Sequence, residues 1–154
     1  MGPPSVIHAA RLCVAGSSYA LSVSLPAGTT HAEAVEKTKV AFAAQGFGLP
    51  KGTLDLNISS ILADKGMPLE KTPEYLVLGF CSPKHAFAGL SNEPAIGLLL
   101  PCNAAIASTA DGVVEVSCID PYALLGIVGN KDSLREFVDE VRAMIKGALA
   151  ALEA

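Results

Sequence analysis

The feature that most constrains this chain is a pair of apolar runs, each of which meets a cysteine beside a proline. Residues 75–80 lead into Cys81-Ser82-Pro83, and residues 96–100 lead into Pro101-Cys102-Asn103. A short continuous apolar run bounded by turn signals is typical of a strand buried on both faces. We therefore expect two central strands, with a thiol where each strand stops and the chain turns. The second is expected to span residues 96–107, with a bulge, an edge position or a strand end at Pro101.

The segments before these runs alternate between strand and helix patterns. Apolar residues alternate over residues 19–25 and 49–58, which indicates two strands. Thr30 and Glu33 have capping-box spacing and predict a helix that stops at Gly46. Ser59 or Ser60 is expected to cap a short helix over residues 61–65. The expected apolar positions of the first helix are Ala34, Val35, Val40, Ala41 and Ala44.

Two junctions place a proline directly after a capping residue. Ser82-Pro83 predicts a helix to about residue 90, and Asp120-Pro121 predicts a helical turn over residues 122–128. Between them, Asp111-Gly112 predicts a hairpin that leads into a strand over residues 113–119. Asp132 or Ser133 is expected to cap a final amphipathic helix to about residue 152. Its apolar positions are Leu134, Phe137, Val138, Val141, Ile145, Leu149 and Leu152.

The order of these elements predicts an α+β fold. Hairpin strands mixed with crossover helices imply a two-layer α/β sandwich, with a mixed, mostly antiparallel sheet and helices packed mainly on one face. We interpret residues 1–17 as an N-terminal extension and residues 18–154 as a single domain, which suits a chain of 154 residues.

The amino-acid composition limits the classes of molecule that this protein is expected to bind. Charged residues make up 17% of the chain and apolar residues 51%. This composition suits either a tightly packed, alanine-rich domain or a homodimer that buries additional surface, and we expect the homodimer because the best-patterned helices carry apolar residues beyond a single stripe. The net charge is −4 and there is no basic cluster, so nucleic acid is not an expected partner. No apolar run approaches the ~20 residues that span a bilayer. The first residues do not resemble a signal peptide or a myristoylation signal, and we expect no membrane partner and a cytoplasmic location.

At these junctions the chain resembles the domain of unknown function 302 family. The resemblance covers about residues 19–150 and rests on Gly46-Phe47-Gly48, on Leu78-Gly79-Phe80-Cys81-Ser82-Pro83, and on Gly97-Leu98-Leu99-Leu100-Pro101-Cys102-Asn103. Asp120-Pro121 with Leu125 also fits. The resemblance implies a small α/β domain with a helix-covered sheet, dimeric, without an established biochemical role.

Cys81 is the first candidate for chemistry. It precedes a predicted helix, and a helix N-terminus favours a nearby thiolate. Cys81 is therefore a candidate nucleophile, redox thiol or soft-metal ligand, with a buried packing residue as the alternative. Ser82 belongs to the same turn. His85 is positioned to supply a base or a metal nitrogen, although we expect an ordinary surface histidine there.

The other candidates depend on which strands are neighbours. Cys102 would lie next to Cys81 if the two apolar runs pair, and the thiols could then form a reversible disulfide or hold a metal. Asn103 could orient a ligand or satisfy backbone groups at a bulge. Asp120 is expected to be a helix cap at the same sheet end as Cys81. Cys13 and Cys118 are interpreted as packing residues, and all four cysteines as reduced.

Three hypotheses follow, and the sequence specifies neither a cofactor nor a metal. The first is a small-ligand or soft-metal binding module with Cys81 and Cys102 lining the site. The second is a thiol-dependent redox or sulfur-handling enzyme that uses Cys81. The third is a dimeric interaction module whose cysteines are structural. There is no phosphate-loop, nucleophile-elbow or paired-histidine motif, so nucleotide binding, serine-hydrolase elbow chemistry and histidine-based metalloprotease chemistry are not expected.

Overall fold

The structure is a computed structural model that describes residues 8–9, 19–49, 55–129 and 131–153. Predictions for residues 10–18 and 50–54, including Cys13 and Leu54, lie outside the described residues. The helices are α1 (His31–Ala44), α2 (Ile58–Asp64), α3 (Pro83–Asn92), α4 (Tyr122–Leu125), α5 (Lys131–Leu152) and a 3-10 helix, η1 (Pro94–Leu99). The strands are β1 (His8–Ala9), β2 (Ala20–Ser24), β3 (Asp55–Asn57), β4 (Glu74–Phe80), β5 (Cys102–Ser108) and β6 (Val114–Ile119).

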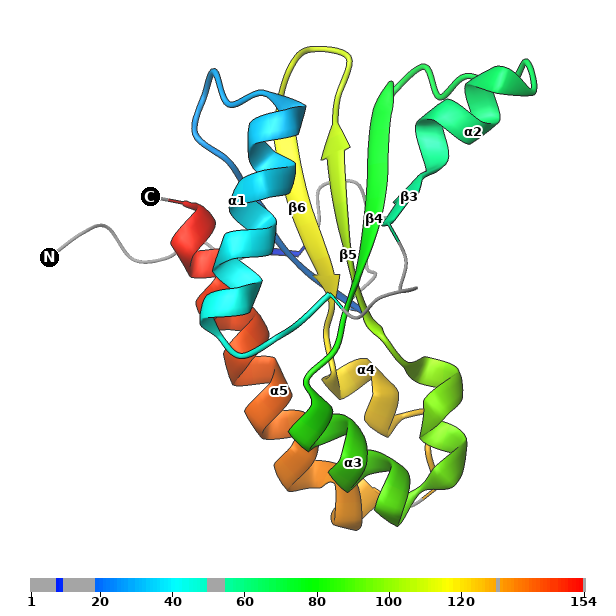
Figure 1. Cartoon of the computed structure of the whole chain (residues 1–154), viewed down its shortest axis with the longest axis vertical. Coiled ribbons are helices and arrows are strands. Elements are labelled where there is room, and N and C mark those ends of the chain that lie inside the picture. Colours follow the sequence, from blue (N-terminus) through cyan, green and yellow to red (C-terminus); the bar gives the residue numbers. More distant parts are fainter. Residues whose placement is uncertain (1–7, 10–18, 50–54, 130, 154) are drawn as a thin grey trace, which may run out of the picture.

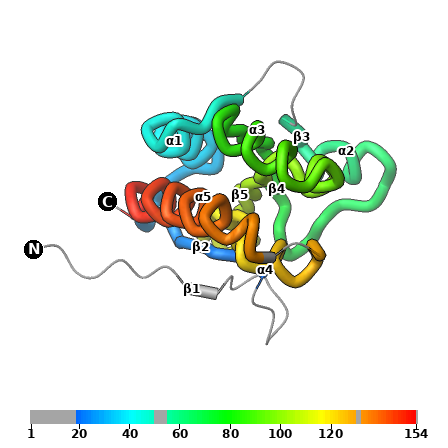
Figure 2. Tube along the Cα trace, turned by 90° about the horizontal axis from the view of Figure 1, so that it is seen from below, coloured from blue at the N-terminus to red at the C-terminus, as the bar shows by residue number. Residues whose placement is uncertain are grey.

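The strands form one sheet in the order β1-β2-β6-β5-β4-β3, and every pairing among the described strands is antiparallel. Helices α1 and α5 lie side by side over one face of this sheet (Figures 1 and 2). The predicted α+β fold with helices on one face is confirmed, but the described strands form a wholly antiparallel sheet and not the mixed, mostly antiparallel sheet that was predicted. Beyond one end of the sheet, α3, η1, α4 and the first half of α5 gather into a helical end of the molecule (Figure 1).

The core lies between the sheet and the two long helices. All seven predicted apolar positions of α5 are buried, so its stripe is confirmed. The prediction for α1 was partly wrong, because Val40 is 70% exposed whereas Thr38 and Phe42 are buried. A helix turns about 100° per residue, so the stripe that starts at Ala34 continues through positions 38, 41 and 42 and leaves Val40 on the opposite side.

Local signals at the ends of α1 were read correctly. Thr30 and Glu33 form the capping box, with each side chain accepting from the other residue's backbone N–H. The helix ends in a Schellman motif at Gly46, whose φ of 94° favours glycine. In this motif the N–H of Gly46 donates to Ala43 O and the N–H of Phe47 donates to Phe42 O. The chain is thereby turned towards the end of β4.

Two strand predictions need correction. Within the described part of the strand expected over residues 49–58, β3 covers Asp55–Asn57 and stops before Ile58, because the Asn57 side chain accepts from the N–H of Ser60 and starts α2 at Ile58. The strand expected from residue 96 begins at Cys102, because residues 94–99 form η1, in which Ile96 is buried and Leu98 is 88% exposed. Periodicity alone does not separate a short apolar strand from a short helix. Cys102 therefore opens a strand and does not end one.

No helix in the described ranges combines the length and apolar character needed to cross a membrane.

Candidate functional site

The junction between β4 and α3 is held in place by the end of α1. The N–H of Cys81 donates to Gly48 O at 2.9 Å, and the N–H of Gly48 donates to Cys81 O at 2.7 Å. Close by, the ring of Phe80 stacks on Phe42 with centroids 4.3 Å apart. The backbone of Cys81 is thus fixed by a segment more than thirty residues earlier in the chain, and its side chain is half-buried.

The two proline-flanked cysteines are neighbours, as expected if their strands pair. Phe80 lies opposite Cys102 in the β4–β5 register. Burial, together with the nearby Cys81, raises the pKa of the Cys102 thiol to about 11. Burial also raises the pKa of Cys118, with a further contribution from Cys102. Cys102 and Cys118 are therefore protonated at neutral pH, and in the described part of the chain no three His, Cys, Asp or Glu side chains are grouped to hold a metal ion.

Ser82 occupies the predicted N-cap position of α3, with Pro83 at the first helical position, but its side chain does not cap the helix. Its hydroxyl oxygen instead lies 2.7 Å from Nδ1 of His85. The cap prediction was right in position and wrong in the partner of the hydroxyl group. The hydroxyl is directed to an imidazole rather than to the backbone.

His85 is not the surface histidine expected from the sequence, since it is only 8% exposed. Helix α3 packs closely on α5: a Cβ atom at Gly89 would lie 3.4 Å from the ring of Phe137. The His85 face of α3 is covered as a result, with Nε2 2.6 Å from Oε2 of Glu140 on α5. Both ring nitrogens are thus engaged by Ser82 and Glu140, and His85 does not serve Cys81 as base.

For a neutral His85 ring, the contact with Glu140 sets the direction of both hydrogen bonds. The hydrogen bond from His85 and the charge of Lys84 hold the pKa of Glu140 below its usual value, so Glu140 is a carboxylate at neutral pH. A carboxylate only accepts hydrogen bonds, which places the proton of a neutral imidazole on Nε2. Nδ1 is then an acceptor, and the hydroxyl of Ser82 donates to it. We call this series Ser82–His85–Glu140 the relay.

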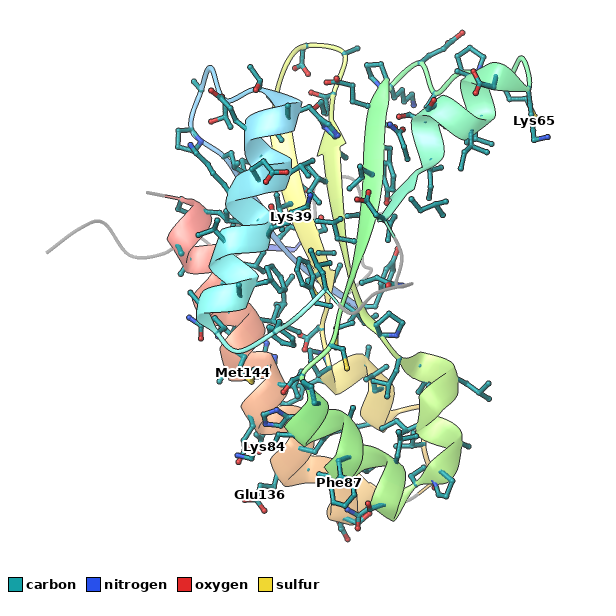
Figure 3. The ribbon with its side chains drawn as sticks, viewed as in Figure 1. Lys39, Lys65, Lys84, Phe87, Glu136 and Met144 are labelled. Carbon is teal, nitrogen blue, oxygen red and sulfur yellow. The ribbon has the colours of Figure 1, made fainter. Side chains whose placement is uncertain are left out.

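His85 lies between two spaces. On one side is a groove of about 290 Å³ between α3 and α5. It is lined by Lys84, His85, Ala88, Asn92, Ser133, Glu136, Phe137 and Glu140. Lys84 and Glu136 project on the same side of the molecule (Figure 3). On the other side is a small cavity of about 10 Å³ whose lining includes Cys81, Ser82 and Cys102. His85 and Phe137 line both spaces, and His85 is the one of the two that carries polar atoms.

Asp120 is also at this end of the sheet, because β4 and β6 both run antiparallel to β5. Its carboxylate accepts from the N–H of Tyr122 at 3.1 Å, but the N-cap position of α4, predicted for Asp120, is occupied by Pro121. It also accepts from Arg142 of α5, at 2.9 Å from Nε and 3.2 Å from Nη2. The Arg142 guanidinium lies 4.3 Å from the centre of the Tyr122 ring. Asp120 thus joins a strand end to α5 through a partly buried ion pair.

Asn103 is not brought to the site. It is exposed and alternates with buried Cys102 along β5, so its side chain lies on the opposite face of the sheet from the thiol. The sequence analysis also missed Glu140 and Arg142, which are the α5 partners of His85 and Asp120. Both are charged residues on the polar side of an amphipathic helix, and one sequence carries no signal that distinguishes them from solvated charges.

An antiparallel sheet with helices on one face and a half-open polar site at a strand end places this chain among small α+β domains. The family model described as "Domain of unknown function DUF302" matches residues 21–152, and the chain belongs to this family, as its motifs predicted. A crystal structure of an uncharacterized conserved DUF302 protein from Bacillus stearothermophilus has a TM-score of 0.76 at 20% identity, covering 89% of this chain and 100% of that chain. This likeness shows a shared fold. No curated protein matches the chain.

Proposed function

We propose that this domain binds a small polar molecule in the groove between α3 and α5, next to the Cys81–Ser82 turn. The observation that supports this is the position of His85, a buried imidazole that borders both the groove and the thiol cavity. A volume of about 290 Å³ is at the lower end of the range of small-molecule sites. Lys84, Asn92 and Glu136 offer charged and amide groups to a polar ligand.

Groove binding is tested by filling the groove. A set of small amine and carboxylate fragments is added to the ¹⁵N-labelled protein, and backbone NMR shifts are expected to move at residues along α3 and the first half of α5. Ala88→Phe places a ring in the groove and should remove these shifts. Ala43→Phe, on the exposed side of α1, is the matched control. Shifts that survive Ala88→Phe, or that appear only elsewhere, would contradict the proposal.

Thiol chemistry at Cys81 is the second candidate function. It is favoured by one contrast: Cys81 is half-buried, whereas Cys102 and Cys118 are buried with raised pKa values. A protonated Cys102 works against a soft-metal site built on both thiolates. We expect iodoacetamide at pH 7 to modify Cys81 in the native protein and to leave Cys102 and Cys118 unmodified until denaturant is added, as read by peptide mass spectrometry. Equal protection of all three thiols would remove this candidate.

The predicted homodimer is retained as a proposal. Several large apolar side chains are exposed, among them Phe87 on α3, which projects from the helical end of the molecule (Figure 3). A dimer predicts a melting temperature that rises with protein concentration. A melting temperature independent of concentration, with a monomeric mass in solution, would contradict it.

A further inference from the structure

We propose that Ser82, His85 and Glu140 act as a hydrolytic relay, in which the hydroxyl oxygen of Ser82 attacks the carbonyl carbon of a short acyl ester. The proposal deepens the function proposed above, since it uses the groove between α3 and α5 to hold the remainder of the ester.

The relay has the hydrogen-bond order that nucleophile activation needs. The Ser82 oxygen is 2.7 Å from Nδ1 of His85, and Nε2 of His85 is 2.6 Å from the carboxylate of Glu140. Both distances are within the range for a nucleophile–base pair and for a base held by a third group. The carboxylate fixes the proton on Nε2, so Nδ1 is free to take the proton of Ser82. His85 is buried, which shields the transfer from water.

Stabilisation of an oxyanion is available from the backbone at the same turn. The first N–H groups of a helix have no intrahelical acceptor, and the Ser82 side chain does not cap those of α3. An ordinary N-cap serine would accept a bond from this first turn. Here the hydroxyl is drawn to His85, and the first turn can donate to a negative oxygen that forms on the carbonyl carbon bonded to Ser82.

The step balances without any co-reactant besides water. The Ser82 oxygen bonds to the acyl carbon as its proton passes to Nδ1, and Glu140 stabilises the resulting imidazolium. The oxyanion collapses, the carbon–oxygen bond to the leaving alcohol breaks, and that oxygen takes the proton from Nδ1. Water then attacks the acyl-serine in the same manner, giving the carboxylic acid and free Ser82. The net reaction is an ester and water to an acid and an alcohol.

Space around Ser82 sets the class of ester. The cavity beside Ser82 and Cys81 has a volume of about 10 Å³, room for about one water molecule and not for an alkyl chain. The acyl group is therefore small, such as acetyl. Ser82 is half-buried, so the leaving part extends outward along the groove past Lys84.

The test uses the full chain with p-nitrophenyl acetate as the probe. Ser82→Ala and His85→Gln are each expected to lower kcat about 100-fold or more, and the double variant should be no worse than either single one. Glu140 is a positioning residue: Glu140→Gln should lower kcat about 10-fold with KM unchanged. Ser91→Ala, on the exposed surface of α3 and outside the groove, is the control and should leave kcat unchanged.

Acetyl groups are located by peptide mass spectrometry after rapid acid quench. Acetyl-Ser82 is the expected adduct. Turnover that persists in Ser82→Ala, or an adduct on Cys81 that Cys81→Ser abolishes, would overturn the relay and favour the thiol. If Ser82→Ala does not fold, Glu140→Gln decides, because the Glu140 side chain is 45% exposed: a normal kcat in Glu140→Gln overturns the relay. If Ser82→Ala abolishes turnover but Ala88→Phe has no effect, the proposal of binding in the groove is contradicted and the proposal of the relay is supported.

Discussion

Two junctions at the same end of the sheet are built alike and differ in what they can do. At each, a strand ends, a polar residue precedes a proline, and a side chain reaches across to α5: Ser82 through His85 to Glu140, and Asp120 to Arg142. Glu140 and Arg142 are two residues apart in α5. Both strand ends are therefore held against the same long helix, and the two junctions differ in the chemical groups that make the contact.

The Asp120 junction is a brace. Asp120 and Arg142 form an ion pair with 2.9 Å between Oδ1 and Nε, and Arg142 also covers the ring of Tyr122. The hydrogen bond to Asp120 raises the pKa of Arg142 further above its ordinary value. The Ser82 junction consists of a hydroxyl, an imidazole and a carboxylate beside an open groove, all of which can exchange protons. The Asp120–Arg142 ion pair holds a strand end against α5. The Ser82–His85–Glu140 relay does the same, and because its groups can exchange protons beside a groove, it can also react with a bound molecule.

The largest predicted effect concerns the brace. Arg142→Met leaves the Asp120 carboxylate, which is 7% exposed, without its counter-charge. The expected cost is about 3 kcal/mol of unfolding free energy, measured by urea denaturation. Adding Asp120→Asn should recover part of this loss, because the uncompensated charge is then gone. An Arg142→Met protein as stable as the wild type would show that the ion pair is not a brace.

The second prediction concerns what fixes the other junction. Gly46 has a φ of 94°, and its turn leads to the Gly48 backbone that bonds to Cys81. Gly46→Ala should cost about 1 kcal/mol in unfolding free energy and change the rate at which iodoacetamide modifies Cys81. Gly129→Ala, at a position without positive φ and with open space around it, is the control and should be neutral. A loss of unfolding free energy without any change in the modification rate of Cys81 would show that the end of α1 does not control the environment of Cys81.

The smallest predicted effect is on the pH dependence of stability. The pKa of Glu140 is lowered in the folded state by its bond from His85, so its contribution is present above the ordinary value of 4.5 and is lost as the pH falls through the folded value. Glu140→Gln should therefore be less stable than the wild type at pH 6, and the gap should close below pH 4.5. A gap that widens on acidification would contradict the assignment.

Most of the fold could be predicted from the sequence because the patterns that specify its helices and turns are local and support one another. The α5 stripe, the capping box at Thr30 and the hairpin at Asp111-Gly112 each depend on residues within one or two turns. The errors came where a short segment suits two structures: residues 96–99 are apolar enough for a strand, yet they form η1 with Leu98 in solvent. Only packing against the rest of the chain decides such a case.

The site was readable only in part. Cys81 and Ser82 could be placed near Cys102 because the two apolar runs that lead to Pro83 and Pro101 were expected to lie side by side in the sheet. In the structure, Phe80 at the end of β4 lies opposite Cys102 at the start of β5. The environment of His85 could not, because it depends on the close approach of α3 to α5 at Gly89 and on Glu140, 55 residues away. Asn103 shows the converse: it is adjacent to Cys102 in sequence, but strand alternation places it on the other face.

The most direct measurement is the protonation of the His85 ring, observed by ¹⁵N NMR of the histidine side chains at pH 8. The account predicts that Nε2 carries the proton, that Nδ1 is an unprotonated acceptor, and that Ser82→Ala shifts the Nδ1 resonance while Ser91→Ala does not. The opposite tautomer, with the proton on Nδ1, would contradict the account, because Ser82 could then only accept from the ring and could not transfer its proton to it.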